Sequence, residues 1–157
     1  MYRIVLDPTI LLRGLFNPFS LCGRLLSQYT HRVQVIFSAQ TRTAVALLLV
    51  NDAWAIKFPA LKQIDPLWVG RLLRSATIIP IPVPHHRNPF VAVAIAANAD
   101  YLVCEHPLFF ELRDAVPVPI IDTRAFITLL EAAPSPPPHC DIGNPGEPTD
   151  PRPSTLP

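Results

Sequence analysis

Acidic and imidazole side chains follow two apolar segments of the chain. Asp7 comes directly after the run Tyr-Arg-Ile-Val-Leu at 2–6, and Glu105 and His106 come after Tyr-Leu-Val-Cys at 101–104. Carboxylates bind hard ions such as Mg²⁺ or Mn²⁺, which orient a water and neutralise developing charge in phosphodiester hydrolysis. Asp7, Glu105 and His106 are therefore the candidate catalytic residues, and Asp7 is the candidate metal ligand.

The supply of acids for such a site is small. After Asp7, the next carboxylate in the sequence is Asp52. The alternative role for Asp7 is structural, with its charge held by helix N-termini and neighbouring polar groups. A further alternative joins Asp7 to His85, His86 and His106 on a transition metal, since imidazole and carboxylate together suit zinc, iron or manganese. Glu105 and His106 could also form an acid–base pair, although the sequence supplies no nucleophile for it.

Short apolar runs alternate with helical stretches along the first 133 residues. Continuous rather than alternating apolar character is typical of strands buried on both faces, and strand–helix alternation predicts right-handed crossovers. The pattern predicts an α/β fold, a three-layer α/β/α sandwich on a mainly parallel sheet of about five strands. The expected strands are 4–6, 33–37, 77–81, 101–103 and 118–121; the expected helices are 19–29, 38–50, 65–75, 89–98, 107–113 and 123–132.

Three helix starts carry a capping signal. Ser38 can cap one helix, and Asp65-Pro66 and Asn88-Pro89 each place a capping side chain before a proline at the first helical position. Ligands of parallel α/β sheets bind outside the carboxyl ends of the strands. The residues expected to converge there are Asp7 to Thr9, Ser38, the segment 85–88 and the segment 104–106.

Composition divides the chain into two parts. Residues 1–133 have the size of one domain and an excess of 12 Lys+Arg over 9 Asp+Glu, which permits contact with RNA without requiring it. Residues 134–157 contain nine prolines in 24 residues, which predicts a disordered tail. No apolar run has the length of a membrane span or a secretory signal, so we expect a cytoplasmic protein without membrane contact.

Residues 43–50 are apolar on nearly every side of the expected helix. A helix of this kind is either wholly buried or part of a contact with another protein or a second copy.

The five glycines form neither GxGxxG nor GxxxxGK[ST], so no phosphate-binding loop is predicted.

Four motifs in order resemble the PIN-domain family, in particular its members described as toxin components of toxin–antitoxin systems. Residues 3–11, RIVLDPTIL, are similar to the family's opening "VVLDTNVLV". Residues 88–94, NPFVAVA, and residues 99–103, ADYLV, are similar to its segment "DDPFLALA…GADYLVTGD". Residues 121–126, IDTRAF, are similar to its closing "TPREF". The resemblance covers about residues 2–132. It implies an α/β/α fold and a metal-dependent ribonuclease with three or four acids at the strand ends.

Carried over residue by residue, the family's four acids fall on Asp7, Ala44, Arg87 and His106. Thr9 takes the place of the family's asparagine, while His86 and Asn88 flank the third position and Ser38 precedes the second. A carboxylate beside an arginine favours an ion pair over a two-metal site. The resemblance thus predicts a catalytically degenerate protein that needs no cofactor and acts by binding RNA, an antitoxin-like protein or a second copy.

The alternative is an active ribonuclease that uses Mg²⁺ or Mn²⁺ at a rearranged site of Asp7, Glu105 and His106. A third possibility is a relic under little functional demand.

Overall fold

Five parallel strands form the centre of the protein in a computed structural model that describes residues 1–50, 56, 66–81 and 86–132. The strands lie in the order β3-β2-β1-β4-β5. Their bounds are β1 Tyr2–Leu6, β2 Val33–Ser38, β3 Thr77–Ile79, β4 Tyr101–Val103 and β5 Ile120–Ile121. The described helices are α1 Pro8–Phe16, α2 Leu21–Gln28, α3 Ala39–Val50, α5 Pro66–Ser75, α6 Pro89–Ala96, α7 Pro107–Phe110 and α8 Thr123–Ala132.

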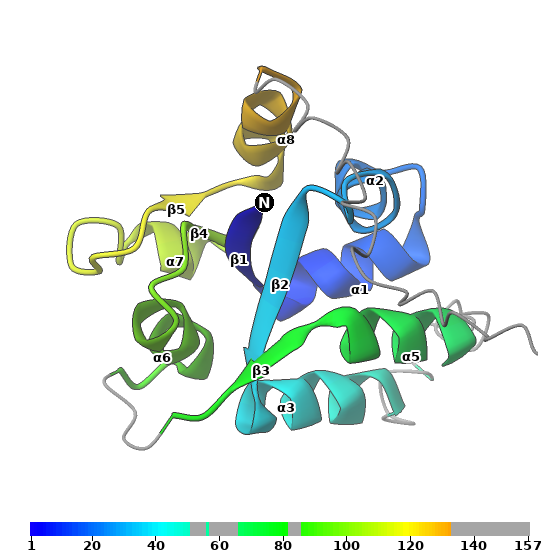
Figure 1. The fold of residues 1–157 in the computed structure, drawn as a ribbon, viewed down its shortest axis with the longest axis horizontal. Helices are drawn as coiled ribbons and strands as arrows, with labels where there is room; N and C mark the ends of the chain where they lie inside the picture. The colour runs from blue at the N-terminus through cyan, green and yellow to red at the C-terminus, as the bar shows by residue number, and fades with distance from the viewer. Residues whose placement is uncertain (51–55, 57–65, 82–85, 133–157) are drawn as a thin grey trace, which may run out of the picture.

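Helices cover both faces of this sheet (Figure 1). Helix α6 packs against β1, β2 and β4, while α2 contacts both α1 and α8 on the other face. The predicted α/β/α sandwich on a parallel sheet is confirmed. The core between the layers is apolar, with Ile4, Phe37 and Phe126 among its fully buried side chains. None of the helices in the described residues is long and apolar enough to cross a membrane.

The strand register places the candidate residues at one edge of the sheet. Leu6 pairs with Val103, and Val103 pairs in turn with Ile121. The Asp7 backbone N–H continues this pairing by donating to the Val103 carbonyl at 3.0 Å, and the Cys104 N–H donates to the Ile121 carbonyl at 3.0 Å. Asp7 and Glu105, from segments almost a hundred residues apart, therefore lie side by side at the carboxyl edge.

All five predicted strands exist, but two are shorter than expected. β3 ends at Ile79 rather than Ile81, and β5 begins at Ile120 rather than Val118. Pro80 and Pro119 lie at these boundaries, and a proline has no N–H to donate to a neighbouring strand. Helix α7 likewise ends at Phe110 rather than at 113, and turns follow it.

Helix α1 is absent from the sequence-based prediction. It begins at Pro8, and the Asp7 side chain caps it by accepting a hydrogen bond from the Thr9 N–H. Its partner is α2, and the contact is close because Gly14 faces the Cys22 backbone and Leu26. A Cβ at position 14 would lie 3.1 Å from the Cys22 carbonyl carbon and oxygen. The two glycine-containing helices therefore form one compact unit beside the carboxyl edge of β1.

Candidate functional site

Asp7 is almost fully buried, with 3% of its surface exposed, and both of its carboxylate oxygens accept hydrogen bonds. One oxygen accepts from the Thr9 backbone N–H at 3.1 Å. The other accepts from the Thr9 hydroxyl and, at 3.4 Å, from the Glu105 backbone N–H. The hydrogen bond from the Thr9 N–H to the Asp7 carboxylate stabilises the first turn of α1, as an N-cap aspartate does in general. Thr9 thus holds the Asp7 carboxylate through both its backbone N–H and its hydroxyl.

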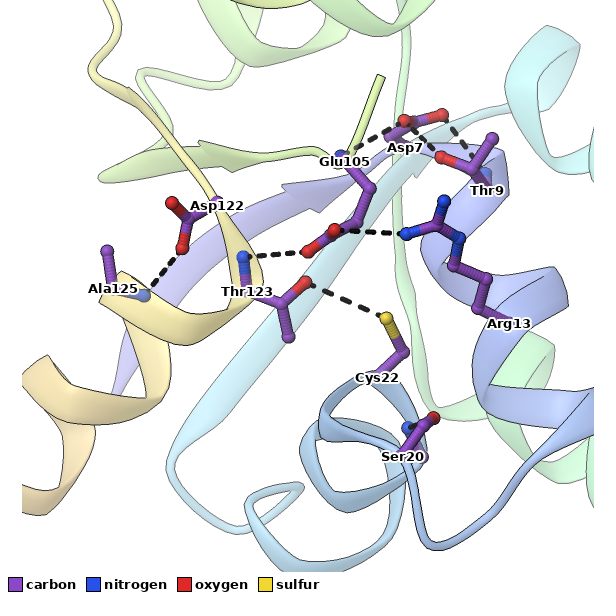
Figure 2. A network of polar contacts seen from close by, with 10 residues as sticks. Asp7, Thr9, Arg13, Ser20, Cys22, Glu105, Asp122, Thr123 and Ala125 are labelled. Atoms are coloured by element: carbon purple, nitrogen blue, oxygen red, sulfur yellow. Dashed lines mark hydrogen bonds and ion pairs between the residues drawn. The ribbon is translucent and has the colours of Figure 1, made fainter. Parts of the chain in front are cut away.

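Glu105 connects three elements at the same edge (Figure 2). One carboxylate oxygen lies 3.1 Å from the Arg13 guanidinium on α1, and the other accepts from the Thr123 N–H at the start of α8 at 3.2 Å. A carboxylate at a helix N-terminus is favoured by the helix dipole, and a charged partner strengthens its hydrogen bonds. Both oxygens of Glu105 are therefore engaged with protein groups.

Two buried thiols lie next to these carboxylates. Cys104 is fully buried, and burial, together with the nearby Asp7 and Glu105 charges, raises the pKa of its thiol to about 12. Burial also raises the pKa of the Cys22 thiol, which lies 3.8 Å from the Thr123 hydroxyl. A raised pKa favours the protonated thiol at neutral pH, which is a poorer nucleophile than a thiolate.

Each of the two described histidines of the predicted site accepts a local backbone hydrogen bond at Nδ1. Nδ1 of His106 accepts from the Leu108 N–H at 3.3 Å and caps α7, and Nδ1 of His86 accepts from the Asn88 N–H at 3.0 Å. His85, from the transition-metal hypothesis, lies outside the described residues. In residues 1–50, 56, 66–81 and 86–132, no three His, Cys, Asp or Glu side chains are grouped so that they could hold a metal ion.

Two predicted helix caps are confirmed, one at the carboxyl end of β2 before α3 and one before α6. The Ser38 hydroxyl accepts from the Thr41 N–H at 3.1 Å, while the Thr41 hydroxyl accepts from the Ser38 N–H at 2.8 Å. Asn88 accepts from the Phe90 and Val91 N–H groups. Asp65 lies outside the described residues, although α5 begins at Pro66 as predicted.

Ser38 and Asn88 therefore have the structural role of helix caps. Ala44, at the position of the family's second acid, is exposed on α3 and offers no polar group.

Arg87 does not bind Asp7. The carboxylate of Asp7 accepts from Thr9 and Glu105, and the ion pair at this edge joins Arg13 to Glu105 instead. Arg87 is exposed and lies in a small cleft of about 200 Å³ between the beginnings of α3 and α6. The predicted pairing of the carboxylate with this arginine is wrong, because the Asp7 oxygens already accept from Thr9 in α1 and from the Glu105 N–H just past β4.

Arg13 and Thr123 are residues of the edge that sequence reasoning missed. Their connection to Glu105 depends on α1 and α8 both approaching the end of β4, which no local sequence pattern specifies. A local signal for α1 did exist, since Asp7-Pro8 has the same form as Asn88-Pro89. Recognising it would have predicted the helix that carries Arg13 and the capping role of Asp7.

Comparison of the chain with protein-family models, with curated proteins and with solved structures found no match.

Proposed function

We propose that this chain is a PIN-like domain that binds RNA without hydrolysing it. The observation that carries the proposal is the difference in bonding along the carboxyl edge. Asp7 and Glu105, the two acids that meet there, have their four oxygens occupied by protein donors. The cleft between the beginnings of α3 and α6 is lined by Arg87, His86 and Gln40 among others, and none of the described residues that line it is a carboxylate. Such groups attract phosphate rather than hydrated metal ions.

The positions that correspond to the family's acids support the same proposal. Ala44 has no ligand atom, Arg87 carries the opposite charge, and His106 caps α7 through Nδ1. A two-metal mechanism needs clustered oxygen ligands that hold both ions in place. An RNA-binding role needs only donors and positive charge near the strand ends.

Cleavage and retention of RNA test the proposal together. Structured and unstructured RNA are incubated with the purified chain, with and without Mg²⁺ or Mn²⁺, alongside Asp7→Asn and Glu105→Gln. We expect no metal-dependent cleavage, and retention of single-stranded RNA that strengthens as salt is lowered. Cleavage that needs metal and disappears in Asp7→Asn would establish the active ribonuclease instead. No retention at low salt would refute the RNA-binding role.

A second candidate is self-association through α3 and β3. A groove of about 340 Å³ is lined by Ala39, Arg42, Thr43, Ala46, Leu47 and Ile78. Leu47 is 61% exposed, so α3 is not wholly buried, and Ile78 on the neighbouring β3 is 41% exposed. β3 is also an edge strand in the described sheet, and edge strands offer unpaired backbone groups to another chain.

Sedimentation velocity tests this candidate. A dimer that dissociates in Leu47→Glu supports it, whereas a monomer at high protein concentration contradicts both the dimer and this role for the groove. An antitoxin-like partner on the same groove remains the third form of the binding proposal, and co-purification with such a protein from the native host tests it.

A further inference from the structure

We propose that the cleft between α3 and α6 is a phosphate-binding pocket in which Arg87, His86 and Gln40 supply the donors. The inference deepens and rests on the proposed RNA-binding function, because it names the chemical group that the domain recognises and the residues that do so. The shared ligand chemistry is a phosphate, whether a free ion or a nucleic-acid phosphodiester.

The pocket is formed by residues that follow β2 and β3. Gln40 lies in the first turn of α3, Ile81 lies just past β3, and the remaining lining residues are His86, Arg87, Pro89 and Ala92. Its volume of about 200 Å³ is smaller than the roughly 300–1,000 Å³ typical of pockets for drug-sized ligands. The size therefore suits a single phosphate group better than a whole nucleotide cofactor.

The orientation of His86 is set by a hydrogen bond that leaves a donor available. Nδ1 accepts from the Asn88 N–H at 3.0 Å, so a neutral His86 carries its proton on Nε2. His86 lines the pocket from the loop before α6, and among the described residues its Nε2 has no hydrogen-bond partner. A donor fixed in this way binds an anion at a lower entropic cost than a freely rotating side chain.

Arg87 is the charged group of the pocket. It is exposed, and within the described residues its guanidinium has no hydrogen-bond or ion-pair partner. Arg13 and Arg24, in contrast, are paired with Glu105 and Glu131. A guanidinium offers five donors in a planar fork that matches phosphate oxygens, so Arg87 is suited to bind an anion bidentately.

Helix α6 contributes its field rather than its N–H groups. The Asn88 side chain already accepts from the Phe90 and Val91 N–H groups, which are therefore not free for a ligand. The positive end of the helix dipole still points toward the pocket, because Pro89 is both the first residue of α6 and part of the lining. None of the described residues that line the pocket is a carboxylate, so none of them offsets this positive potential.

Titration with inorganic phosphate, followed by amide NMR, tests the pocket directly. Sodium chloride at matched ionic strength separates binding from screening. We expect saturable shifts at Gln40, Asn88 and Phe90. Arg87→Gln should weaken phosphate binding at least about tenfold, as loss of a bidentate charged contact does. Arg124→Gln, which removes an exposed arginine on α8, is the matched control and should leave affinity within about twofold.

Single-stranded RNA provides the second arm of the experiment. For Arg87→Gln we expect weaker retention and a salt dependence of binding that is shallower by about 0.7, the contribution of one phosphate contact to a single strand. Gln40→Ala should give a smaller loss in the same direction. Equal phosphate affinities in Arg87→Gln, Arg124→Gln and the unchanged chain would overturn the pocket.

The two arms also separate the pocket from the proposed function. RNA held equally by the unchanged chain and Arg87→Gln would contradict the pocket while leaving RNA binding intact. Phosphate binding that depends on Arg87, in a chain that retains no RNA at low salt, would support the pocket and refute the RNA-binding function.

Discussion

The carboxyl edge of the sheet has two halves, and they differ in whether their charged side chains are bonded to other protein groups. In the β1–β4–β5 half, Asp7 and Glu105, which follow β1 and β4, are bonded to Thr9 and Arg13 of α1 and to Thr123 of α8. In the β2–β3 half, Arg87 lies in an open cleft and has no ion-pair partner among the described residues. The bonding of the first half stabilises the fold, while the donors of the second half are available to a ligand.

This difference predicts a separation of effects. Substitutions in the β1–β4–β5 half should change the free energy of unfolding, and substitutions in the β2–β3 half should change binding. Charge alone does not distinguish the two halves. What distinguishes them is whether a charged side chain already has its hydrogen-bond partners within the protein.

The largest effect on stability is expected for Asp7→Ala. This change removes the cap of α1 and leaves the Glu105 N–H without its acceptor, which should lower the free energy of unfolding by about 2–3 kcal/mol. Urea denaturation followed by circular dichroism measures the loss. Asp7→Asn, which keeps one acceptor oxygen, is the matched control and should lose less than half as much. Equal stability of Asp7→Ala and the unchanged chain would contradict the structural role of this carboxylate.

A smaller effect is expected from the Cys104 thiol at high pH. Its pKa is raised from 9.0 to about 12 in the folded chain, so between these values the folded chain keeps a proton that the unfolded chain has released. The free energy of unfolding should therefore be unaffected by this group below about pH 9. Above that it should fall by up to about 1.4 kcal/mol for each pH unit.

Denaturation between pH 8 and 10.5, compared with Cys104→Ala, isolates this contribution from the other groups that titrate there. The variant should show a shallower decline with pH than the unchanged chain. Parallel declines would mean that solvent reaches the thiol and that the β1–β4–β5 half is less closed than its bonding indicates.

The ion pair between Arg13 and Glu105 should contribute modestly. The Arg13 side chain is 61% exposed and that of Glu105 is 23% exposed, so water screens much of their attraction. A double-mutant cycle of Arg13→Gln and Glu105→Gln should give a coupling energy of about 0.2–1 kcal/mol. The single Glu105→Gln change should cost more than Arg13→Gln, because it also weakens the acceptor for the Thr123 N–H. The reverse order would show that the contact with α8 is unimportant.

The smallest stability effect is expected for Arg87→Gln. The Arg87 side chain is exposed and unpaired within the described residues. The free energy of unfolding of Arg87→Gln should therefore stay within about 0.5 kcal/mol of that of the unchanged chain, as for Arg124→Gln. Thermal denaturation of both variants checks this. A large loss in Arg87→Gln would contradict the assignment of this half of the edge to binding.

Local sequence signals predicted much of the fold, and their failures have physical causes. Buried strands and the caps at Ser38 and Asn88 follow from residue type and spacing, so they were predictable. The strands predicted at 77–81 and 118–121 are longer than the observed β3 and β5, because the apolar character of the sequence continues past the prolines at which strand pairing ends. Helix α1 was missed although Asp7-Pro8 has the form of a capped start, because the segment was interpreted through its strand and family motif alone.

The candidate site was less predictable than the fold. Asp7 and Glu105 were placed at the same edge by the parallel-sheet rule, and their backbone contact agrees with that placement. The rule does not say which donors the carboxylates accept from. Arg13 and Thr123 reach Glu105 only because α1 and α8 pack at the end of β4, at sequence separations of 92 and 18 residues.

The sequence by itself determined a parallel α/β sheet with polar residues at its carboxyl ends, because strand burial, helix caps and prolines act through neighbouring residues. Only the tertiary structure decided that Asp7 and Glu105 are bonded internally while Arg87 lies open in a cleft. The reason is that a side chain's partners come from distant segments, and the packing of the helices fixes which of them are within hydrogen-bonding distance.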